Sequence, residues 1–438
     1  MHNPWQDSYR ALLNRLDIYA ARAGWTMCGL SLCVDAFTQL DDTCCAQLAA
    51  GPDGAQALSA ELRRRAAAGI GGEIRFNWPD GPAWLDANLP LRAALGGTPA
   101  HAAKLLTRLG APALLALEHR SPEQIAVLDA DMLLAAEEPI RAAEVQPQGI
   151  DRMRVYVFEY TAGDSVAGAV PPRSSRIIVR FHDFDLERDT HFARLAPRLL
   201  RANPGRGSGI LAGFNSLGEG MRLESGLRYG RGIAADWKAA GIGVIHVEMA
   251  GYETPAGRER ALNGLAGSMT SLGMSLSEFR AIDPEAPSLA EGLCRLATRL
   301  GLSRISVHAD DWAISATRHD PDQEREALMM GCLLASARAA AGGISIPSAL
   351  PAGAHFAEPP PEESRGEWHI VSCPSPHLPR PRATLGLGDT FMAGCLLVLG
   401  QPKLPDLSAS FDRTTNLAPS PAACGAAPHE AHSFSSLS

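Results

Sequence analysis

The chain has little lysine and few aromatic residues. Lysine supplies only three of its 40 basic residues, and aromatic residues make up 6% of the 438. With a formal net charge of −8, the chain does not resemble a general nucleic-acid binder, which carries a basic face. Phosphate ligands are not excluded, and we expect any phosphate clamp to use arginine side chains and backbone N–H groups. The shortage of lysine also fits a simple genomic bias, since alanine is abundant.

Paired cysteines, a secretory leader and long apolar runs are also missing. The nine cysteines include no Cys-x-x-Cys pair, and the first 25 residues are polar and amphipathic, without an apolar core. No apolar run reaches the roughly 18 residues that a membrane span needs. We therefore expect a reduced cytoplasmic protein with buried thiols and no membrane partner.

Three catalytic motifs are absent from the chain. They are G-x-x-x-x-G-K-[ST], G-x-S-x-G and H-E-x-x-H. Their absence excludes a Walker-type phosphate loop, a hydrolase nucleophile elbow and a zinc-protease helix. Residues 205–209 (GRGSG) look like a phosphate cradle, but no strand clearly precedes them. We interpret this stretch as a flexible loop.

Short apolar runs alternate with helical stretches along most of the chain. Runs of this kind are typical of buried strands. The alternation predicts an α/β fold with a mostly parallel sheet and helices on both faces. We expect strands at 27–31, 113–117, 210–214, 244–249, 305–309 and 369–372, and helices at 9–23, 57–68, 100–109, 289–300, 323–340 and 390–399.

Other segments depart from this alternation. Residues 154–160 (RVYVFEY) and 176–182 (RIIVRFH) have the pattern of half-exposed antiparallel strands, and residues 70–92 are rich in Gly, Pro and Trp. We expect a small β-rich lid, inserted at about 37–95 and 150–185 into a main domain spanning 1–405. Residues 406–438 are rich in Ser, Pro, Ala and Thr, and we expect a disordered C-terminal tail there.

The segment Gly386-Leu387-Gly388-Asp389 is the strongest local signal. Two glycines precede an aspartate that opens an apolar helix, and a helix N-terminus offers unpaired N–H groups and partial positive charge. An aspartate placed there could deprotonate a hydroxyl while the N–H groups hold phosphoryl oxygens. The alternative is an N-capping aspartate after a glycine turn.

Four weaker signals lie elsewhere in the chain. His246 and Glu248 share one side of an expected strand, and Glu278 follows a turn of small residues. Asp35 follows the first strand, and Gly96–Gly97 leads into a helix. Taken singly, these residues fit an exposed strand end, a solvated carboxylate at a helix start, and two turns.

In this order, the motifs resemble the ADP-dependent glucokinase/phosphofructokinase family of the ribokinase-like superfamily. The resemblance covers roughly residues 25–400, and its most specific parts are Thr384–Thr390 and His246–Glu248. It implies a ribokinase-like three-layer sandwich with a mostly parallel central sheet and a small β-rich lid. It also implies Mg²⁺-dependent transfer of a phosphoryl group from ADP to a hydroxyl of a hexose or hexose phosphate.

The resemblance implies roles at the phosphoryl-transfer end of such a site. Asp389 resembles the catalytic base, and Gly386–Gly388 resembles the anion hole. Glu248 and Glu278, with Asp389, resemble the carboxylates that organise Mg²⁺ through water. Arg176 resembles the arginine that contacts the nucleotide phosphates.

The resemblance also implies contacts with the acceptor sugar. Asp35 and Gly96–Gly97 resemble residues that bind sugar hydroxyls, and Glu73 resembles a lid glutamate that some members use for glucose. The family's asparagines are replaced here by Ser31, Cys33, Thr98 and Ser275. Each replacement removes an amide that both donates and accepts hydrogen bonds, which leaves the acceptor open. His308 resembles a family histidine to which we assign no role.

Two other functions are compatible with these residues. One is a kinase of the same fold that uses ATP and another acceptor, since the donor is set by loops near 371–381. The other is a non-catalytic protein that binds sugar or nucleotide, although such a protein would need no base at Asp389. We expect nucleotide and sugar or sugar phosphate as ligands, no nucleic-acid partner, and a monomer or homodimer.

Overall fold

A computed structural model of the protein describes residues 3–404. Within these residues the chain forms two sheets, and the main sheet has the strand order β15-β16-β14-β13-β12-β11-β10-β1-β5-β6-β7. Its central strands, all parallel, are β13 (Arg304–His308), β12 (Ser271–Ser275), β11 (Val244–Glu248), β10 (Ser208–Leu211), β1 (Thr26–Gly29), β5 (Ala113–Leu115) and β6 (Leu133–Ala135). The antiparallel strands at its two edges are β14 (Trp312–Thr317), β16 (Trp368–Pro374), β15 (Glu363–Arg365) and β7 (Pro139–Arg141).

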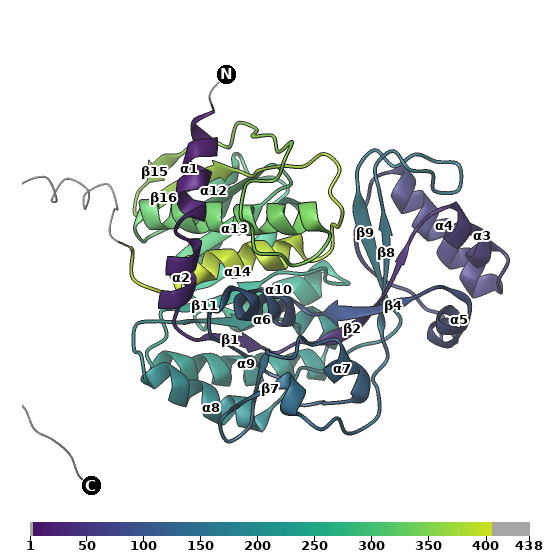
Figure 1. Ribbon diagram of the computed structural model, residues 1–438, viewed down its shortest axis with the longest axis horizontal. Coiled ribbons are helices and arrows are strands. Elements are labelled where there is room, and N and C mark those ends of the chain that lie inside the picture. The colour runs from purple at the N-terminus through teal and green to yellow at the C-terminus, as the bar shows by residue number, and fades with distance from the viewer. Residues whose placement is uncertain (1–2, 405–438) are drawn as a thin grey trace, which may run out of the picture. The chain divides into compact units, whose positions relative to one another are not determined.

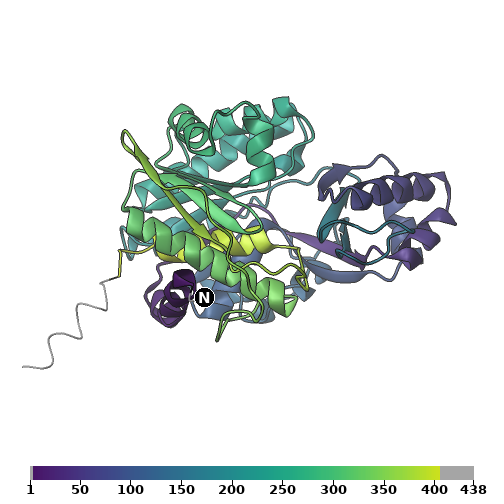
Figure 2. The same ribbon diagram turned by 90° about the horizontal axis from the view of Figure 1, so that it is seen from above.

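Helices cover both faces of the main sheet, which confirms the expected α/β layering (Figures 1 and 2). One group packs around α14 and consists of α1 (Pro4–Leu13), α2 (Leu16–Arg22), α6 (Thr98–Leu109), α13 (Pro321–Ala341) and α14 (Leu387–Leu399). Helices on the other face share one large apolar core. They are α8 (Thr190–Arg201), α9 (Met221–Ala239), α10 (Pro255–Leu265), α11 (Leu276–Ile282) and α12 (Leu289–Leu300).

Several sequence predictions need correction. The helix expected at 9–23 is two helices, because the chain breaks before Arg15, which pairs with Glu326 of α13. The loop expected at 205–209 is limited to 205–207, since Ser208 opens β10. The turn expected before Glu278 is strand β12. Within residues 3–404, no helix is both long and apolar enough to span a membrane, and the tail expected at 406–438 lies outside the described residues.

The small sheet has the order β3-β9-β8-β2-β4. Its apolar face packs under three helices and forms a second core of its own (Figure 1). The strands are β2 (Cys33–Gln39), β3 (Gly72–Arg75), β4 (Arg92–Gly96), β8 (Val155–Tyr160) and β9 (Ser175–Arg180), and the helices are α3 (Asp42–Ala49), α4 (Asp53–Ala67) and α5 (Gly81–Asn88).

Charged side chains gather on the opposite face of the small sheet, because neighbouring residues of a strand point to opposite faces. Strands β8 and β9 are antiparallel, as predicted, and Glu159 lies opposite Arg176. The prediction that 154–160 is half-exposed is wrong for β8, which is buried throughout. Glu159 accounts for part of this burial, since it accepts hydrogen bonds from Thr384, in the loop before α14.

The chain passes four times between the two sheets, at 29–33, 96–98, 141–155 and 180–190. Glu187, on the last passage, is fully buried and accepts hydrogen bonds from the backbone N–H groups of Glu118 (2.9 Å) and His119 (3.1 Å). It also pairs with Arg152 of the third passage at 2.6 Å, and its own N–H donates to the carbonyl of Leu30 on the first. Glu187 therefore joins three of the four passages at one point.

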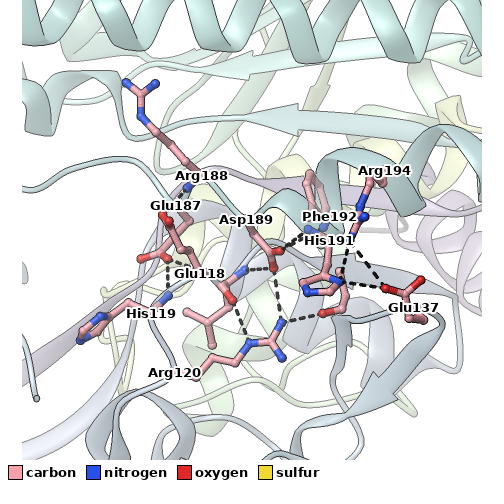
Figure 3. Close-up of polar contacts among 12 residues, drawn as sticks. Glu118, His119, Arg120, Glu137, Glu187, Arg188, Asp189, His191, Phe192 and Arg194 are labelled. Atoms are coloured by element: carbon pink, nitrogen blue, oxygen red, sulfur yellow. Dashed lines mark hydrogen bonds and ion pairs between the residues drawn. The ribbon is translucent and has the colours of Figure 1, made fainter. Parts of the chain in front are cut away.

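Asp189 reinforces this junction two residues later (Figure 3). Its carboxylate caps α8 by accepting from the N–H groups of His191 (2.8 Å) and Phe192 (3.1 Å), and it pairs with Arg120. A pocket opens beside it, lined by Arg120, His191, Glu118 and Gln148 among others. Two of its polar groups are paired within the protein, since Arg120 donates to the carbonyls of Leu117 and Ala135 and Glu118 accepts from the N–H of Arg188.

Candidate active site

Helix α14 begins where the sequence predicted an anion-binding turn. Gly386 is its N-cap in the left-handed region (φ 71°), and Leu387 is its first residue. The sequence predicted that Asp389 opens this helix. The helix begins two residues earlier, so Asp389 lies within its first turn. The N–H groups of the first turn have no partner within a helix, so this helix start combines free N–H groups with a carboxylate.

Two cations and a hydroxyl surround Asp389. Burial raises the pKa of Asp389 above its ordinary value, while a hydrogen bond from Thr98 and the charges of Arg338 and Arg176 lower it again. The carboxyl group is thus drawn toward neutrality by burial and held toward ionisation by its neighbours, as a base that takes up a proton requires.

Arg338, on α13, is a site residue that the sequence analysis missed. It is 6% exposed, its Nη1 donates to Thr390 Oγ1 at 3.1 Å, and its guanidinium lies where a Cβ on Gly386 would be. Burial lowers the pKa of Arg338 to about 10, although the Asp389 carboxylate raises it. Among the described residues, its Nε has no hydrogen-bond partner. A lone arginine in the apolar run 333–340 is the signal that could have revealed it.

Glu248 is held by two histidines at the carboxyl end of β11. His246 Nε2 lies 2.8 Å from one carboxylate oxygen, and His308 Nε2 lies 3.5 Å from the other. Burial raises the pKa of Glu248, but hydrogen bonds from the two imidazoles bring it down to about 2. Gly273 on β12 leaves the space that the carboxylate fills. His308, which had no assigned role, therefore links Glu248 to the start of α14, because its ring also packs against Gly388.

Glu278 is half-buried and forms a capping box at the start of α11. Its carboxylate accepts from the N–H and hydroxyl of Ser275, both at 2.7 Å, while its own N–H donates to Ser275 Oγ. Burial raises the pKa of Glu278, and the negative charge of Glu248 raises it further. Ser275 thus keeps Glu278 in place through its backbone N–H and its hydroxyl.

These carboxylates form no metal cage. Within residues 3–404, no group of three or more His, Cys, Asp or Glu side chains is placed to hold a metal ion directly. The charge of Glu248 nevertheless raises the pKa of both Glu278 and Asp389, so the three share one electrostatic environment. This donor set fits a hydrated Mg²⁺ held mainly by other ligands, since Mg²⁺ keeps several waters in such sites.

Asp35 approaches Asp389 from strand β2 of the small sheet. It is 5% exposed and lies 3.5 Å from Cys33 Sγ, and the missing side chain of Gly96 leaves space for it. Burial raises the pKa of Asp35 to about 7, and the Asp389 charge contributes to this rise. Gly97 has a φ of 96° and approaches the carbonyl of Ser31, which only glycine does without strain.

Glu73 and Arg176 also come from the small sheet. Glu73 pairs with Arg180 at 2.8 Å and accepts from Asn215 Nδ2 at 3.3 Å. A pocket lined by Glu73, Tyr252 and other residues opens beside it. Arg176 is half-buried, and its charge lowers the pKa of Asp389 and of the His101 imidazole, which burial already lowers. The structure therefore brings every predicted site residue to one region between the two sheets.

Comparisons with known proteins agree with this arrangement. A family model described as the ADP-specific Phosphofructokinase/Glucokinase conserved region matches residues 55–398. An ADP-dependent glucose/glucosamine kinase from Pyrococcus furiosus is 25% identical over an alignment of 187 residues, and the match covers 35% of this chain. That match spans 41% of the relative's own length.

Solved structures with the same fold are more complete matches. An ADP-dependent kinase in complex with fructose-6-phosphate and ADPbetaS has a TM-score of 0.75 at 18% identity, covering 92% of this chain and 99% of that one. The last common ancestor of ADP-dependent phosphofructokinases from Methanosarcinales has a TM-score of 0.68 with the same identity and coverage. A hypothetical ADP-dependent phosphofructokinase from Pyrococcus horikoshii OT3 has a TM-score of 0.67 at 17% identity, covering 86% of this chain and 98% of that one.

Proposed function

Because the chain belongs to the ADP-specific phosphofructokinase/glucokinase family, we propose that it is an Mg²⁺-dependent kinase that uses ADP. The acceptor is a hydroxyl of a hexose or hexose phosphate. The observation that carries the proposal is Asp389 in the first turn of α14, with Arg338 and Arg176 beside it. A nucleophile's proton, a base and a set of anion-binding groups can meet there, which is what phosphoryl transfer requires.

Asp389 acts as the general base in this proposal. Its carboxylate accepts the proton of the acceptor hydroxyl as that oxygen attacks the terminal phosphorus of ADP, and the bond from this phosphorus to the bridging oxygen breaks so that AMP leaves. Backbone N–H groups of Gly386–Gly388 hold the phosphoryl oxygens at the positive end of the helix. Arg176 and Arg338 add fixed positive charge on the same side, in a partly buried setting where charge interactions are strong.

The acceptor lies against the small sheet in this proposal. Asp35 accepts hydrogen bonds from sugar hydroxyls, and Gly96–Gly97 lets the sugar approach the backbone. Glu73, held by Arg180 and Asn215, offers a second carboxylate on the same sheet. The small sheet would then act as a lid that excludes water from the reacting groups.

The metal requirement is part of the proposal. Bound to the nucleotide phosphates, Mg²⁺ would neutralise charge on the transferred group. Glu248 and Glu278 would hold its water ligands. The two histidines on Glu248 keep that carboxylate ionised, since its pKa, although raised by burial, is brought down to about 2 by their hydrogen bonds.

The proposal is tested by a matrix of donors and acceptors. ADP and ATP are each combined with hexoses, hexose phosphates and Mg²⁺, and phosphorylated product is measured. We expect turnover with ADP and at least one hexose or hexose phosphate. Turnover with ATP alone would instead identify an ATP-using kinase of the same fold. Nucleotide binding without turnover in any combination would identify a non-catalytic binding protein.

The base assignment is tested by Asp389→Ala. We expect kcat to fall by a factor of about 10² or more, with the affinity for ADP nearly unchanged, because the carboxylate acts on the acceptor proton. The measurements are steady-state kinetics and calorimetric titration with ADP. Asp53→Ala is the matched control, since Asp53 is also an aspartate in the first turn of a helix but is exposed. Nearly full activity in Asp389→Ala would refute the assignment.

A further inference from the structure

A buried chain of hydrogen bonds leads from α13 to Glu248. Arg304 Nε lies 2.8 Å from a carboxylate oxygen of Glu324, and Arg304 Nη1 lies 3.1 Å from Ser271 Oγ. Ser271 Oγ lies 2.9 Å from His246 Nδ1, and His246 Nε2 lies 2.8 Å from Glu248 Oε2. The four residues from Glu324 to His246 are each at most 2% exposed.

The direction of each bond in this chain is fixed by its two ends. An arginine can only donate, so Ser271 Oγ accepts from Arg304. An ionised carboxylate can only accept, so His246 Nε2 must carry a proton toward Glu248. In a neutral imidazole Nδ1 is then bare, and the single hydroxyl proton of Ser271 donates to it. The opposite tautomer would direct the Nε2 lone pair at the carboxylate and leave the Ser271 proton without this acceptor.

We propose that Ser271 and Arg304 are positioning residues that lock His246 in the Nε2–H tautomer and so fix the orientation of Glu248. Arg304 orients the serine hydroxyl, and the hydroxyl sets the imidazole. His246 then donates a hydrogen bond to Glu248 Oε2, while Glu248 Oε1 faces His308. Residues that orient a metal-binding carboxylate or histidine from behind often change the metal affinity or the activity when they are mutated. The consequence for Mg²⁺ rests on the proposed function, whereas the tautomer does not.

The tautomer is measured directly by ¹⁵N NMR of histidine-labelled protein, without substrate or metal. The signals of His246 are identified by their loss in His246→Gln. In the unmodified protein we expect a protonated Nε2 and a bare Nδ1, and a protonated Nδ1 would overturn the proposal. In Ser271→Ala, Glu248 still requires a proton on Nε2, but Nδ1 loses the hydrogen bond that it accepts, so we expect the Nδ1 shift to move toward that of a bare nitrogen without a donor. Unchanged shifts in Ser271→Ala would also overturn it.

The positioning role is measured as the Mg²⁺ concentration needed for half-maximal activity. Ser271→Ala should raise this concentration about tenfold or more, and Ser271→Thr, which keeps the hydroxyl, should restore it. Ser315→Ala is the matched control, because Ser315 is equally buried on β14 and its hydroxyl has no partner among residues 3–404. An altered Nδ1 shift in Ser271→Ala without altered Mg²⁺ dependence would overturn the positioning role. Inactivity of the parent protein would refute the proposed function and leave the NMR test intact.

Discussion

A left-handed glycine and a buried arginine meet where α14 begins. Gly386 has a φ of 71°, and the guanidinium of Arg338 fills the space that a side chain would need there. Each residue therefore depends on the other. Any side chain at 386 displaces the cation beside Asp389, and loss of the cation leaves the helix start without its support at Thr390.

Gly386→Ala should therefore lower both stability and turnover. The left-handed backbone costs an alanine about 1–2 kcal/mol, and displacement of Arg338 should reduce kcat well beyond that effect. Gly301→Ala is the control, because Gly301 also has a positive φ (67°), at the end of α12, but no described atom is near its missing side chain. Melting temperature and kcat are measured for both. If both variants lose only stability and to the same extent, the contact with Arg338 does not matter for catalysis.

At the scale of residues, the sequence pointed to candidate site residues but not to the side chains that surround them. Asp389 stood out because it follows a glycine, and Glu248 because it ends a strand. Asp35 stood out as a carboxylate expected just after the first strand, but it lies inside strand β2. Arg338 was not singled out, because the apolar run around it does not show which glycine this arginine will contact. His246 could be predicted as a partner of Glu248 because the two residues share a strand. Ser271 and Arg304, which support His246, could not be predicted because they come from two other strands.

Among the elements, strand β8 makes an unexpected connection to the loop before α14. Glu159 Oε1 accepts from both the backbone N–H and the hydroxyl of Thr384, two residues before Gly386. A strand of the small sheet thereby holds the loop that precedes α14 in the main domain. The sequence gives no sign of this bond, because Glu159 is 225 residues away from its partner.

Glu159→Leu should loosen that loop. It removes the acceptor for two hydrogen bonds, and a buried donor left without a partner costs about 1–3 kcal/mol. We expect faster amide exchange at 382–390 and a tenfold or greater fall in kcat. Glu159→Gln is the conservative control, since its carbonyl oxygen can still accept both bonds. Equal exchange rates in the Leu and Gln variants would show that the bond does not hold the loop.

Parallel strands were the most predictable elements, and helix α9 was among the least. The parallel strands expected near β1, β5, β10, β11 and β13 are all present, as is the antiparallel strand β16, because apolar runs mark strands buried on both faces. Strand β12 was missed because Ser271, Gly273 and Ser275 interrupt its apolar run. Helix α9 carries glycines that weaken a helical pattern, yet Gly226 and Gly230 are needed there to fit against Leu217 and Phe214.

The whole molecule carries buried acids whose pKa values are shifted in opposite directions. Burial raises the pKa of Asp35 to about 7, and it also raises those of Glu73, Glu187 and Asp389. The pKa of Glu248, also raised by burial, is brought down to about 2 by its histidines. Acids with raised pKa values bind more protons when folded, so their contribution to stability is lost as pH rises. The contribution of Glu248 is lost as pH falls below about 4.

The melting temperature should therefore fall as pH rises from about 5 to 8. Asp35 contributes to this loss because its folded pKa, near 7, lies far above the ordinary value of 3.8. Asp35→Asn removes that titration, so the variant should lose several degrees less than the parent over the same range. Scanning calorimetry at both pH values gives the comparison, with Asp53→Asn, an exposed aspartate, as control. A loss in Asp35→Asn equal to that of the parent would contradict the assignment.

The four passages between the sheets have a further consequence for proteolysis. A protease that cuts one passage leaves three peptide connections between the small sheet and the main sheet. Glu187 also holds three passages to one another without covalent bonds. A singly nicked chain should therefore run as fragments on a denaturing gel yet elute as one species under native conditions. Splitting the gene within one passage is accordingly a route to an enzyme reassembled from two separately expressed pieces.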